Sequence, residues 1–333
     1  MVKEQSIKEY DVVIIGGGAA GLSAAVTLGR ALRSVLVIDA GEPRNAPAAG
    51  VHGFLSRDGI DPRELLELGR EEARGYGVDI VDGVAVAARS TASEDEGAEP
   101  AFEVDLGEGI TVKARRLLVT TGLTDLLPGI EGLRERWGRD VLHCPYCHGW
   151  EVRNKAIGIL GTVPMALHQT LLFRQWSPDI TLFLNDVVEP TDEEWEQLAA
   201  RSINVVEGKV RSLEVTDDAV SGVVLASGKV IPVEAMVTGT RLEARSGVLE
   251  SLGVKVVEHP MGVGRHVEVN PMGGATSVPG VWAAGNVVDL MGQVMASAAS
   301  GVMAGAAINA HLITGETRLA VEAARKNSGR RSA

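Results

Sequence analysis

The feature that most constrains the fold of this chain is a glycine-rich turn between a buried strand and a helix. Residues 10–15 (YDVVII) form a short apolar run typical of a buried parallel strand. The turn at residues 16–21 (GGGAAG) follows directly, and a helical stretch then runs through Arg33. A second apolar strand over residues 35–38 ends at Asp39. This order predicts a nucleotide-binding βαβ unit.

Each glycine of the turn has a physical reason to be there. Gly16 allows the tight turn, Gly18 lets a pyrophosphate approach the backbone, and Gly21 lets the helix and the strand pack closely. The helix N-terminus supplies unpaired N–H groups and a favourable dipole for the phosphates. Asp39 lies 18 positions after Gly21, where it can accept hydrogen bonds from a ribose. The motif by itself does not choose between FAD and NAD.

The pattern of elements restarts farther along the chain. A strand, a helix and a further strand are expected at 156–161, 164–176 and 180–184, which repeats the opening unit. Other strands are expected near 80–88, 102–106, 117–119, within 203–237 and from 281, before a long helix rich in small residues. The acidic stretch 90–101 is predicted to be a hairpin tip, and the charged run 191–196 a solvated helix start.

At 333 residues the chain is too long for one ordinary core, which favours two domains. The order of the elements predicts an α/β fold with two Rossmann-like (three-layer ββα) nucleotide-binding domains, the second inserted into the first. The first domain is expected over residues 1–122 and 241–333, and the inserted domain over residues 123–240.

The second glycine turn is degenerate. Gly161 takes the place of the first glycine, Val163 of the second and Ala166 of the third. Val163 should block the approach of a pyrophosphate, and Pro164 removes an N–H donor from the helix start. No Arg or Lys cluster follows Leu184 to hold a 2′-phosphate. We therefore expect this domain to have lost NAD(P) binding, although an altered turn that still binds NAD(P)H remains an alternative.

Charge and hydropathy exclude several classes of function. A net charge of −12 argues against nucleic-acid binding. Residues 1–10 contain no apolar segment of the secretory type. Residues 293–312 are apolar but broken by Gln293 and Asn309, which favours a buried helix over a membrane span. We expect a cytoplasmic protein.

The only two cysteines, Cys144 and Cys147, are three positions apart in the run HCPYCHGW. Such a pair is either redox-active or half of a zinc site. Zinc would need two further ligands, and His143 and His148 are each adjacent to a cysteine, which makes chelation of one ion awkward. We therefore predict a redox pair and no metal.

A helix that starts at this pair would favour its chemistry. A helix N-terminus lowers the pKa of a cysteine thiol and so raises the thiolate fraction. His148 directly follows Cys147 and could carry the proton that dithiol oxidation must release. The alternative for His148 is an ordinary polar residue at a helix start.

Together these motifs resemble the low-molecular-weight thioredoxin reductase family, from about Tyr10 to about Gly315. The similarity includes the glycine turn, the TTG at 120–122, the CxxC ahead of the second unit, and TSVPGVWAAGN at 276–286. The resemblance implies that the first domain binds FAD and that the protein is a homodimer. It also implies that Cys147 lies against the flavin while Cys144 meets the substrate.

The departures from that family are informative. His148 stands where the family has Asp, and Asn286 replaces the Asp of its closing Gly-Asp, although an Asn can still hydrogen-bond the ribityl chain. A CxxCHG motif with a degraded nicotinamide site is similar to the dithiol oxidases of gliotoxin and holomycin biosynthesis. The stretches GEPRN (41–45) and HGFLSRDG (52–59) resemble that subgroup as well. Those flavoenzymes close a disulfide in a small molecule and pass the electrons to O2.

The resemblance gives a predicted mechanism. A substrate thiolate attacks Cys144 of the disulfide and releases Cys147, and the second substrate thiol then resolves the mixed disulfide while His148 takes up a proton. FAD and then O2 accept the electrons. The alternatives are an NAD(P)H- or ferredoxin-dependent reductase of a thioredoxin-like protein, and a catalytically silent flavoprotein.

The predicted site has a catalytic and a cofactor-binding set. The catalytic residues are Cys144, Cys147 and His148. The predicted FAD contacts are Gly16, Gly18, Ala20, Gly21, Asp39, Ala40, Arg44, Asn45, Val84, Thr121, Gly122, Gly285, Asn286, Gln293 and Val294.

Overall fold

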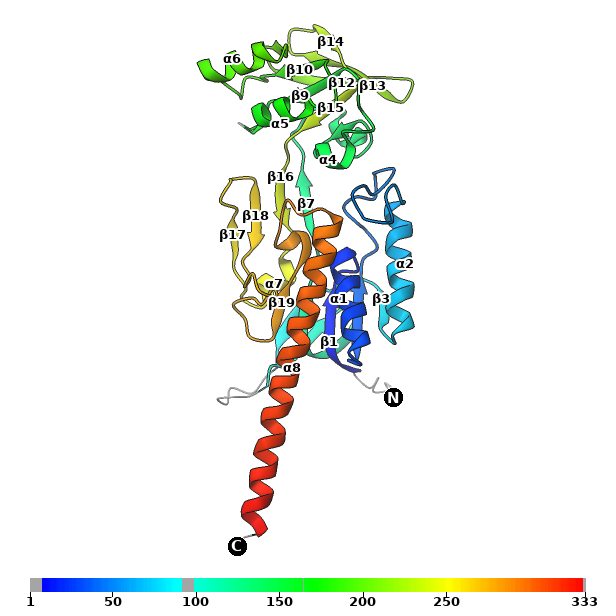
Figure 1. Cartoon of the computed structure of the whole chain (residues 1–333), viewed down its shortest axis with the longest axis vertical. Coiled ribbons are helices and arrows are strands. Elements are labelled where there is room, and N and C mark those ends of the chain that lie inside the picture. Colours follow the sequence, from blue (N-terminus) through cyan, green and yellow to red (C-terminus); the bar gives the residue numbers. More distant parts are fainter. Residues whose placement is uncertain (1–7, 92–98, 164, 332–333) are drawn as a thin grey trace. The chain divides into compact units, whose positions relative to one another are not determined.

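The computed structural model describes residues 8–91, 99–163 and 165–331 of the chain (Figure 1). The chain divides into two compact units. Unit 1 comprises residues 1–43, 63–124 and 243–333, and unit 2 comprises residues 44–62 and 125–242. Each unit contains a parallel sheet with helices, so the predicted α/β class with two Rossmann-like domains is confirmed.

One segment differs from the predicted division of the chain. Residues 44–62 were expected in the first nucleotide domain, but they belong to unit 2. Arg44 forms an ion pair with Asp125, and a Cβ atom on Gly138 would lie 2.8 Å from the Cβ of Pro47. These contacts join two segments that are far apart in the sequence, so no local pattern indicates them.

Unit 1 is built on a seven-stranded sheet in the order β3-β2-β1-β6-β5-β4, in which β19 also pairs with β6. Strands β1, β2, β3, β6 and β19 are parallel, whereas β4 and β5 form an antiparallel hairpin. The strands are β1 (Glu9–Ile15), β2 (Val35–Asp39), β3 (Asp79–Asp82), β4 (Ala87–Ser90), β5 (Phe102–Asp105), β6 (Thr111–Val119) and β19 (Val281–Ala283). The helices are α1 (Ala19–Arg30), α2 (Pro62–Gly75), α7 (Gly247–Ser251), η1 (Gly285–Val287) and α8 (Val294–Arg331). A second sheet has the order β17-β18-β16-β7, with β17 (Val256–Glu258), β18 (Gly264–Val267), β16 (Arg241–Ala244) and β7 (Leu123–Leu126).

Strand β1 is apolar throughout because both of its faces are buried. Val13 and Ile15 belong to the core cluster on one side of the sheet, and Val12 and Ile14 to the cluster on the other. Successive side chains of a strand point to opposite faces, so a continuous apolar run is what a strand covered on both sides requires.

The close contact of helix α8 with α1 explains why α8 is rich in small residues. A Cβ atom on Gly301 would overlap the carbonyl oxygen of Ala20, so only glycine permits this approach. Ala304, Ile308 and Leu312 are fully buried on the same side. The expectation of a buried helix therefore holds for one face of α8. Helix α8 is long and apolar enough to cross a membrane, but a helix in the core of a soluble protein can have the same length and composition.

Unit 2 contains a five-stranded parallel sheet in the order β11-β10-β9-β15-β8 and an antiparallel sheet β12-β13-β14. Its strands are β8 (Val141–Leu142), β9 (Ile157–Leu160), β10 (Ile180–Phe183), β11 (Asn204–Val206), β12 (Val210–Thr216), β13 (Ala219–Leu225), β14 (Val230–Pro232) and β15 (Ala235–Thr238). Its helices are α3 (Leu133–Arg136), α4 (Pro145–His148), α5 (Ala166–Phe173) and α6 (Asp192–Ala200). Thr191 and Glu194 form a capping box at the start of α6, which confirms the predicted helix start.

Three predicted elements have different bounds. Helix α1 ends at Arg30 rather than Arg33, because Leu32 takes a left-handed φ of 62°. The strand predicted near 80–88 is two strands, β3 and β4. The helix predicted over 164–176 spans Ala166–Phe173, and Pro164 lies outside the described residues. So does most of the predicted hairpin tip, at residues 92–98, although β4 and β5 on either side of it pair as expected.

Candidate active site

The phosphate turn of unit 1 has the geometry that its sequence predicts. Gly16 has a φ of +108°, and a Cβ atom there would lie 2.5 Å from the carbonyl oxygen of Thr120. A Cβ on Gly21 would overlap the carbonyl oxygen of Gly16. Gly18 is the N-cap of α1, and a Cβ there would meet no atom within 4 Å. Gly18 therefore keeps an open space at the start of the helix, where a pyrophosphate fits.

Asp39 at the end of β2 is held in place on both of its oxygens. Oδ1 accepts a hydrogen bond of 2.9 Å from the N–H of Gly17, and Oδ2 accepts one of 3.0 Å from Arg70. Arg70 lies on α2 with its side chain 12% exposed, and it also pairs with Asp82. Each carboxylate oxygen retains a lone pair for a ribose hydroxyl. Sequence reasoning missed Arg70, which is 31 positions from Asp39 and marked by no motif.

The remaining predicted cofactor residues of unit 1 follow its strands or lie at the starts of its helices. Ala40 is exposed after β2, and Val84 is 60% exposed after β3. Gly122 has a φ of +71°, and the hydroxyl of Thr121 donates a 2.6 Å hydrogen bond to the carbonyl of Arg245. Ala20 is buried in α1, and its Cβ is 2.9 Å from where a Cβ on Gly285 would lie. Val294 begins α8, and the carbonyl of Gln293 just before it accepts from the N–H of Ser297.

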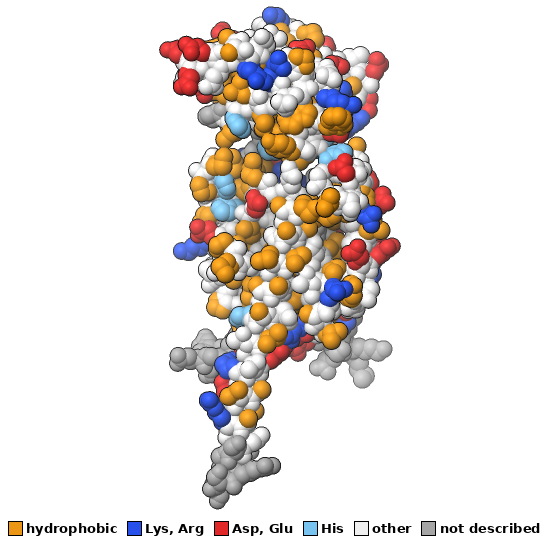
Figure 2. Space-filling model, in the orientation of Figure 1, with side chains coloured by type: hydrophobic (Ala, Val, Ile, Leu, Met, Phe, Trp, Pro, Cys, Tyr) orange, Lys and Arg blue, Asp and Glu red, His pale blue; other side chains and the backbone are white. Residues whose placement is uncertain are grey.

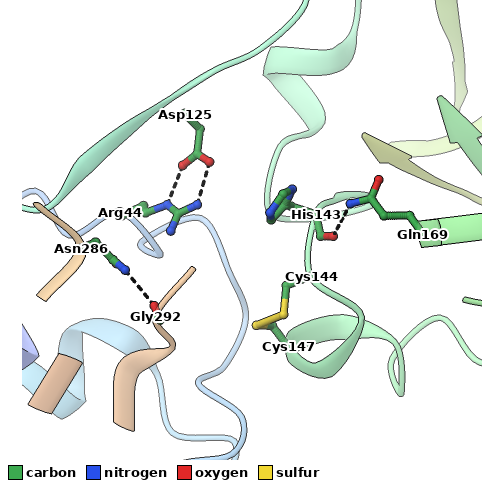
Figure 3. The surroundings of a disulfide bond; sticks show 8 residues. All are labelled: Arg44, Asp125, His143, Cys144, Cys147, Gln169, Asn286 and Gly292. Carbon is green, nitrogen blue, oxygen red and sulfur yellow. Dashed lines mark hydrogen bonds and ion pairs between the residues drawn. A yellow bond between two sulfur atoms is a disulfide. The ribbon is translucent and has the colours of Figure 1, made fainter. Parts of the chain in front are cut away.

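Asn286 is oriented by its own loop. Its Nδ2 donates hydrogen bonds of 2.8 Å to the carbonyl of Asp289 and of 2.8 Å to the carbonyl of Gly292 (Figure 3). Both amide hydrogens are thereby used, and Oδ1 remains as an acceptor. Asn286 thus offers the hydrogen-bond acceptor that the Asp of the thioredoxin reductase pattern would offer, without its charge.

Arg44 and Asn45, predicted as flavin neighbours, lie in unit 2. Arg44 donates from Nε and Nη2 to Asp125 over 2.6 and 2.7 Å (Figure 3). The hydroxyl of Thr240 donates to the same carboxylate over 3.0 Å. The backbone carbonyl of Asn45 accepts from Ala48. In the structure Arg44 thus holds the loop at 44–62 to the rest of unit 2.

The two cysteines form a disulfide at the start of α4, with 5.3 Å between their Cα atoms (Figure 3). Cys144 is the N-cap of the helix and Pro145 is its first residue, a position where proline is common because its fixed φ suits the helix. The N–H groups of Cys147 and His148 point to the carbonyl of Cys144, at 3.3 and 3.2 Å. The predicted helix start at the pair is therefore present.

His148 ends α4 beside Cys147, and its environment suits a proton acceptor. Burial lowers its pKa, Glu151 opposes this shift, and His52 adds to it, so the pKa lies below its ordinary value. Its Nε2 is buried and has no hydrogen-bond partner among the residues that the structure describes. A neutral imidazole with a free nitrogen can accept a proton near neutral pH.

His143 on the other side of the pair is a structural residue. Its Nδ1 lies 3.3 Å from the carbonyl of Thr238, and its own carbonyl accepts from Gln169 over 3.5 Å (Figure 3). Burial lowers the pKa of His143 below its ordinary value, against the hydrogen bond to Thr238. Its contacts therefore account for its position next to Cys144.

The second glycine turn is filled by its own side chains. Val163 lies beside Gly239, the residue after β15, with its Cγ2 3.2 Å from where a Cβ on Gly239 would lie. Asn185, after β10, donates to the carbonyl of Gly161 over 3.2 Å and accepts from the N–H of Val210 over 2.8 Å. Asn185 lies one position beyond the counterpart of Asp39, because Phe183 pairs in β10 as Ile38 does in β2. The amide of Asn185 is used by the backbone. Pro164, which is predicted to remove an N–H donor from the helix start, lies outside the described residues.

Comparisons with known proteins agree with this arrangement. Residues 10–305 match the family model described as pyridine nucleotide-disulphide oxidoreductase. Thioredoxin reductase tcpT from Claviceps purpurea is 30% identical over 313 residues, which cover 91% of this chain and 94% of that protein. The probable thioredoxin reductase of Arthroderma benhamiae is 34% identical over 176 residues, or 53% of this chain and 44% of that protein, so the match spans under half of that relative.

Among solved structures, that of HlmI superposes with a TM-score of 0.88 and 43% sequence identity, covering 98% of this chain and 99% of that one. The phosphate turn, with its open space at Gly18, fits the FAD that this family binds. The chain belongs to the pyridine nucleotide-disulphide oxidoreductase family, as a thioredoxin-reductase-like, FAD-dependent disulfide oxidoreductase.

Proposed function

We propose that the protein oxidises a small-molecule dithiol to a disulfide through Cys144 and Cys147, with O2 as the final electron acceptor. The observation that carries this proposal is the filled second turn. Val163 stands where a bare glycine would let a pyrophosphate approach the backbone, and the amide of Asn185 just after β10 is bonded to the backbone. The first turn is open. Electrons then enter from the substrate thiols rather than from NAD(P)H.

The residues of unit 2 perform the exchange. A substrate thiolate attacks Sγ of Cys144, the Cys144–Cys147 bond breaks, and Cys147 leaves as a thiolate. The second substrate thiol attacks the mixed disulfide, which releases Cys144 and the oxidised product. His148 accepts a proton released in these steps. FAD, when bound, supplies the two-electron acceptor that re-forms the disulfide.

In unit 1, the residues described above would hold that cofactor. The open turn at Gly18 would receive the pyrophosphate, Asp39 a ribose, and Asn286 the ribityl chain. In this proposal Cys147 is the sulfur that meets the flavin and Cys144 the sulfur that meets the substrate.

The proposal includes a homodimer and a cytoplasmic location. Helix α8 carries apolar side chains on its outer face, and Figure 2 shows hydrophobic side chains on the side of unit 1 turned to the viewer. The exposed ones are Met295, Val302, Met303, Ile313, Leu319 and Val321. Exposed apolar side chains of this kind support a protein contact, and a second copy of the chain would cover some of them.

A second candidate is a reductase that uses the same cysteines in the opposite direction, with NAD(P)H or ferredoxin as donor. The observation in its favour is that curated relatives such as tcpT carry the name thioredoxin reductase. The two candidates differ in where the electrons enter.

One experiment separates them. The purified yellow protein is mixed under strict anaerobiosis with NADPH or with dithiothreitol, and the flavin absorbance band is followed. We expect dithiothreitol to bleach the band and NADPH to leave it unchanged. Admission of O2 should restore the band. Rapid bleaching by NADPH would show that the second turn still binds it and would make the protein a reductase.

A further inference from the structure

A third histidine of unit 2 lies between two carboxylates close to the redox pair. Nδ1 of His52 is 3.3 Å from Oδ2 of Asp58, and its Nε2 is 3.4 Å from Oε1 of Glu151. The side chain of His52 is 25% exposed, whereas those of Asp58 and Glu151 are 69% and 40% exposed. Both ring nitrogens thus face an acceptor, an arrangement that an imidazolium satisfies with two N–H donors.

The loop that carries His52 is held by its own backbone. The N–H of Val51 donates to the carbonyl of Ile60, and the N–H of Gly59 donates to the carbonyl of Val51, each over 2.8 Å. The N–H of Gly53 donates to Oδ1 of Asp58 over 2.9 Å, so this carboxylate is fixed beside the imidazole. These bonds set the position of the ring independently of any ligand.

Glu151 connects this loop with the redox pair. It lies three residues after His148, the last residue of α4, in the turn that follows the helix. Its carboxylate acts electrostatically on His148, and so does the ring of His52. His52 thus contacts the carboxylate that also acts on His148.

We propose that His52, fixed by Asp58, is a positioning residue that governs proton uptake by His148 during thiol–disulfide exchange, with Glu151 as the link between the two rings. The inference rests on the proposed role of His148 as the proton acceptor of the exchange. Glu151 favours a proton on His148, whereas a proton on His52 opposes it and competes for the same carboxylate.

The step balances without a further reactant. The substrate dithiol gives up two electrons and two protons, its sulfur–sulfur bond forms, and the Cys144–Cys147 bond breaks and takes the two electrons. One proton goes to His148, and the groups that face this histidine are Glu151, His52 and the new Cys147 thiolate. The other proton goes to solvent or to the released Cys144.

The test measures the exchange itself on the FAD-bound protein. Dithiothreitol is mixed with the oxidised protein over a range of pH, the reaction is quenched with acid, and free thiols are alkylated and counted by mass spectrometry. Rates are corrected for the thiolate fraction of dithiothreitol. The fall in rate that remains on the acid side of the pH–rate profile, the acid limb, then reports protonation of His148. This readout involves neither O2 nor NADPH, so it stands even if the proposed oxidase direction is wrong.

Glu151→Gln and His52→Gln should move this limb in opposite directions. Loss of the carboxylate should shift it to lower pH, and loss of the second imidazole to higher pH, each by about half a pH unit for charges a few ångströms apart. Asp58→Asn keeps an acceptor for Gly53 and should shift the limb in the same direction as His52→Gln. His168→Gln, on the exposed side of α5, is the matched control and should leave it unchanged.

Two results would overturn the proposal. If His52→Gln and Asp58→Asn fold normally and leave the limb where it is in the native protein, His52 has no influence on proton uptake. If Glu151→Gln and His52→Gln shift the limb in the same direction, the effect is a general disturbance of the loop rather than competition for one carboxylate.

Discussion

Arg44 and Asp125 form a two-point ion pair, with Nε–Oδ2 and Nη2–Oδ1 distances of 2.6 and 2.7 Å. The carboxylate side chain is only 6% exposed, while that of Arg44 is 29% exposed. Parallel hydrogen bonds of this kind are the strongest form of an arginine–carboxylate contact. The pair fixes the start of the loop at 44–62, which also carries His52.

Replacing Arg44 by Met should destabilise the protein, because the buried Asp125 carboxylate would lose its partner. Breaking a buried pair on one side costs about 3–5 kcal/mol, and the partial exposure of Arg44 reduces the expectation to about 2–3 kcal/mol. Urea unfolding of the FAD-bound protein measures the loss. Arg44→Met combined with Asp125→Leu should recover part of it, and equal stability of the single variant and the native protein would contradict the expectation.

The same pair should make stability depend on pH in the acid range. Burial is the largest influence and raises the pKa of Asp125, but the hydrogen bonds and charge of Arg44, with Thr240 and His143, together bring it below its ordinary value. A depressed carboxyl pKa contributes stability that is present above the unfolded value of about 3.9 and is lost as pH falls through the folded value. The slope of unfolding free energy against pH below about 4 should be shallower in Arg44→Met than in the native protein.

Gly18→Val should remove FAD and leave the fold intact. The φ of Gly18 is −77°, which a valine accepts, and its Cβ would meet no protein atom within 4 Å. The side chain would occupy the space that the pyrophosphate needs. The ratio of flavin to protein absorbance measures the loss. Gly129→Val, at another open position outside the phosphate turn, is the control and should keep its flavin.

Cys144→Ser and Cys147→Ser should each abolish dithiol turnover while FAD remains bound, because neither cysteine lies in the unit that carries the phosphate turn. Oxygen consumption with a dithiol measures turnover, and the flavin spectrum shows that the cofactor is retained. Full activity in either variant would refute a mechanism through this disulfide.

His148→Ala should lower the exchange rate by about 100-fold or more, the contribution typical of a positioned proton acceptor. Because burial is the largest influence and lowers the pKa of His148, the acid limb of the native protein should lie below about 6.5. The limb should disappear in the variant. An unchanged pH–rate profile would make His148 an ordinary polar residue of the helix end.

Much of the fold could be predicted because its signals are local. The turn at Gly16 and the cysteine pair each depend on a few consecutive residues, and both have the expected local structure. The apolar run of β1 likewise reports its own burial on both faces. Helix ends were less well predicted, because Leu32 adopts a left-handed conformation that its residue type does not favour.

The contacts that orient the site could not be predicted in this way, since they join distant segments. Arg70 reaches Asp39 across 31 positions, and Arg44 reaches Asp125 across 81. Similarity to the dithiol oxidases places Arg44 near a flavin, which stays a prediction, but it gives no indication of the carboxylate that the side chain contacts. The stretch from His52 to Asp58 is marked in the sequence only by its similarity to the dithiol oxidases. Its chemistry depends on Glu151, which no motif connects to it.

The bonding of Asn185 makes the loss of the second nucleotide site hard to reverse in evolution. A glycine in place of Val163 would reopen the turn, but an arginine at position 185, where it could meet a 2′-phosphate, would leave the N–H of Val210 without its acceptor. Each unpaired buried group costs about 1–3 kcal/mol. Restoring a basic group at this position therefore costs stability before a nucleotide can bind.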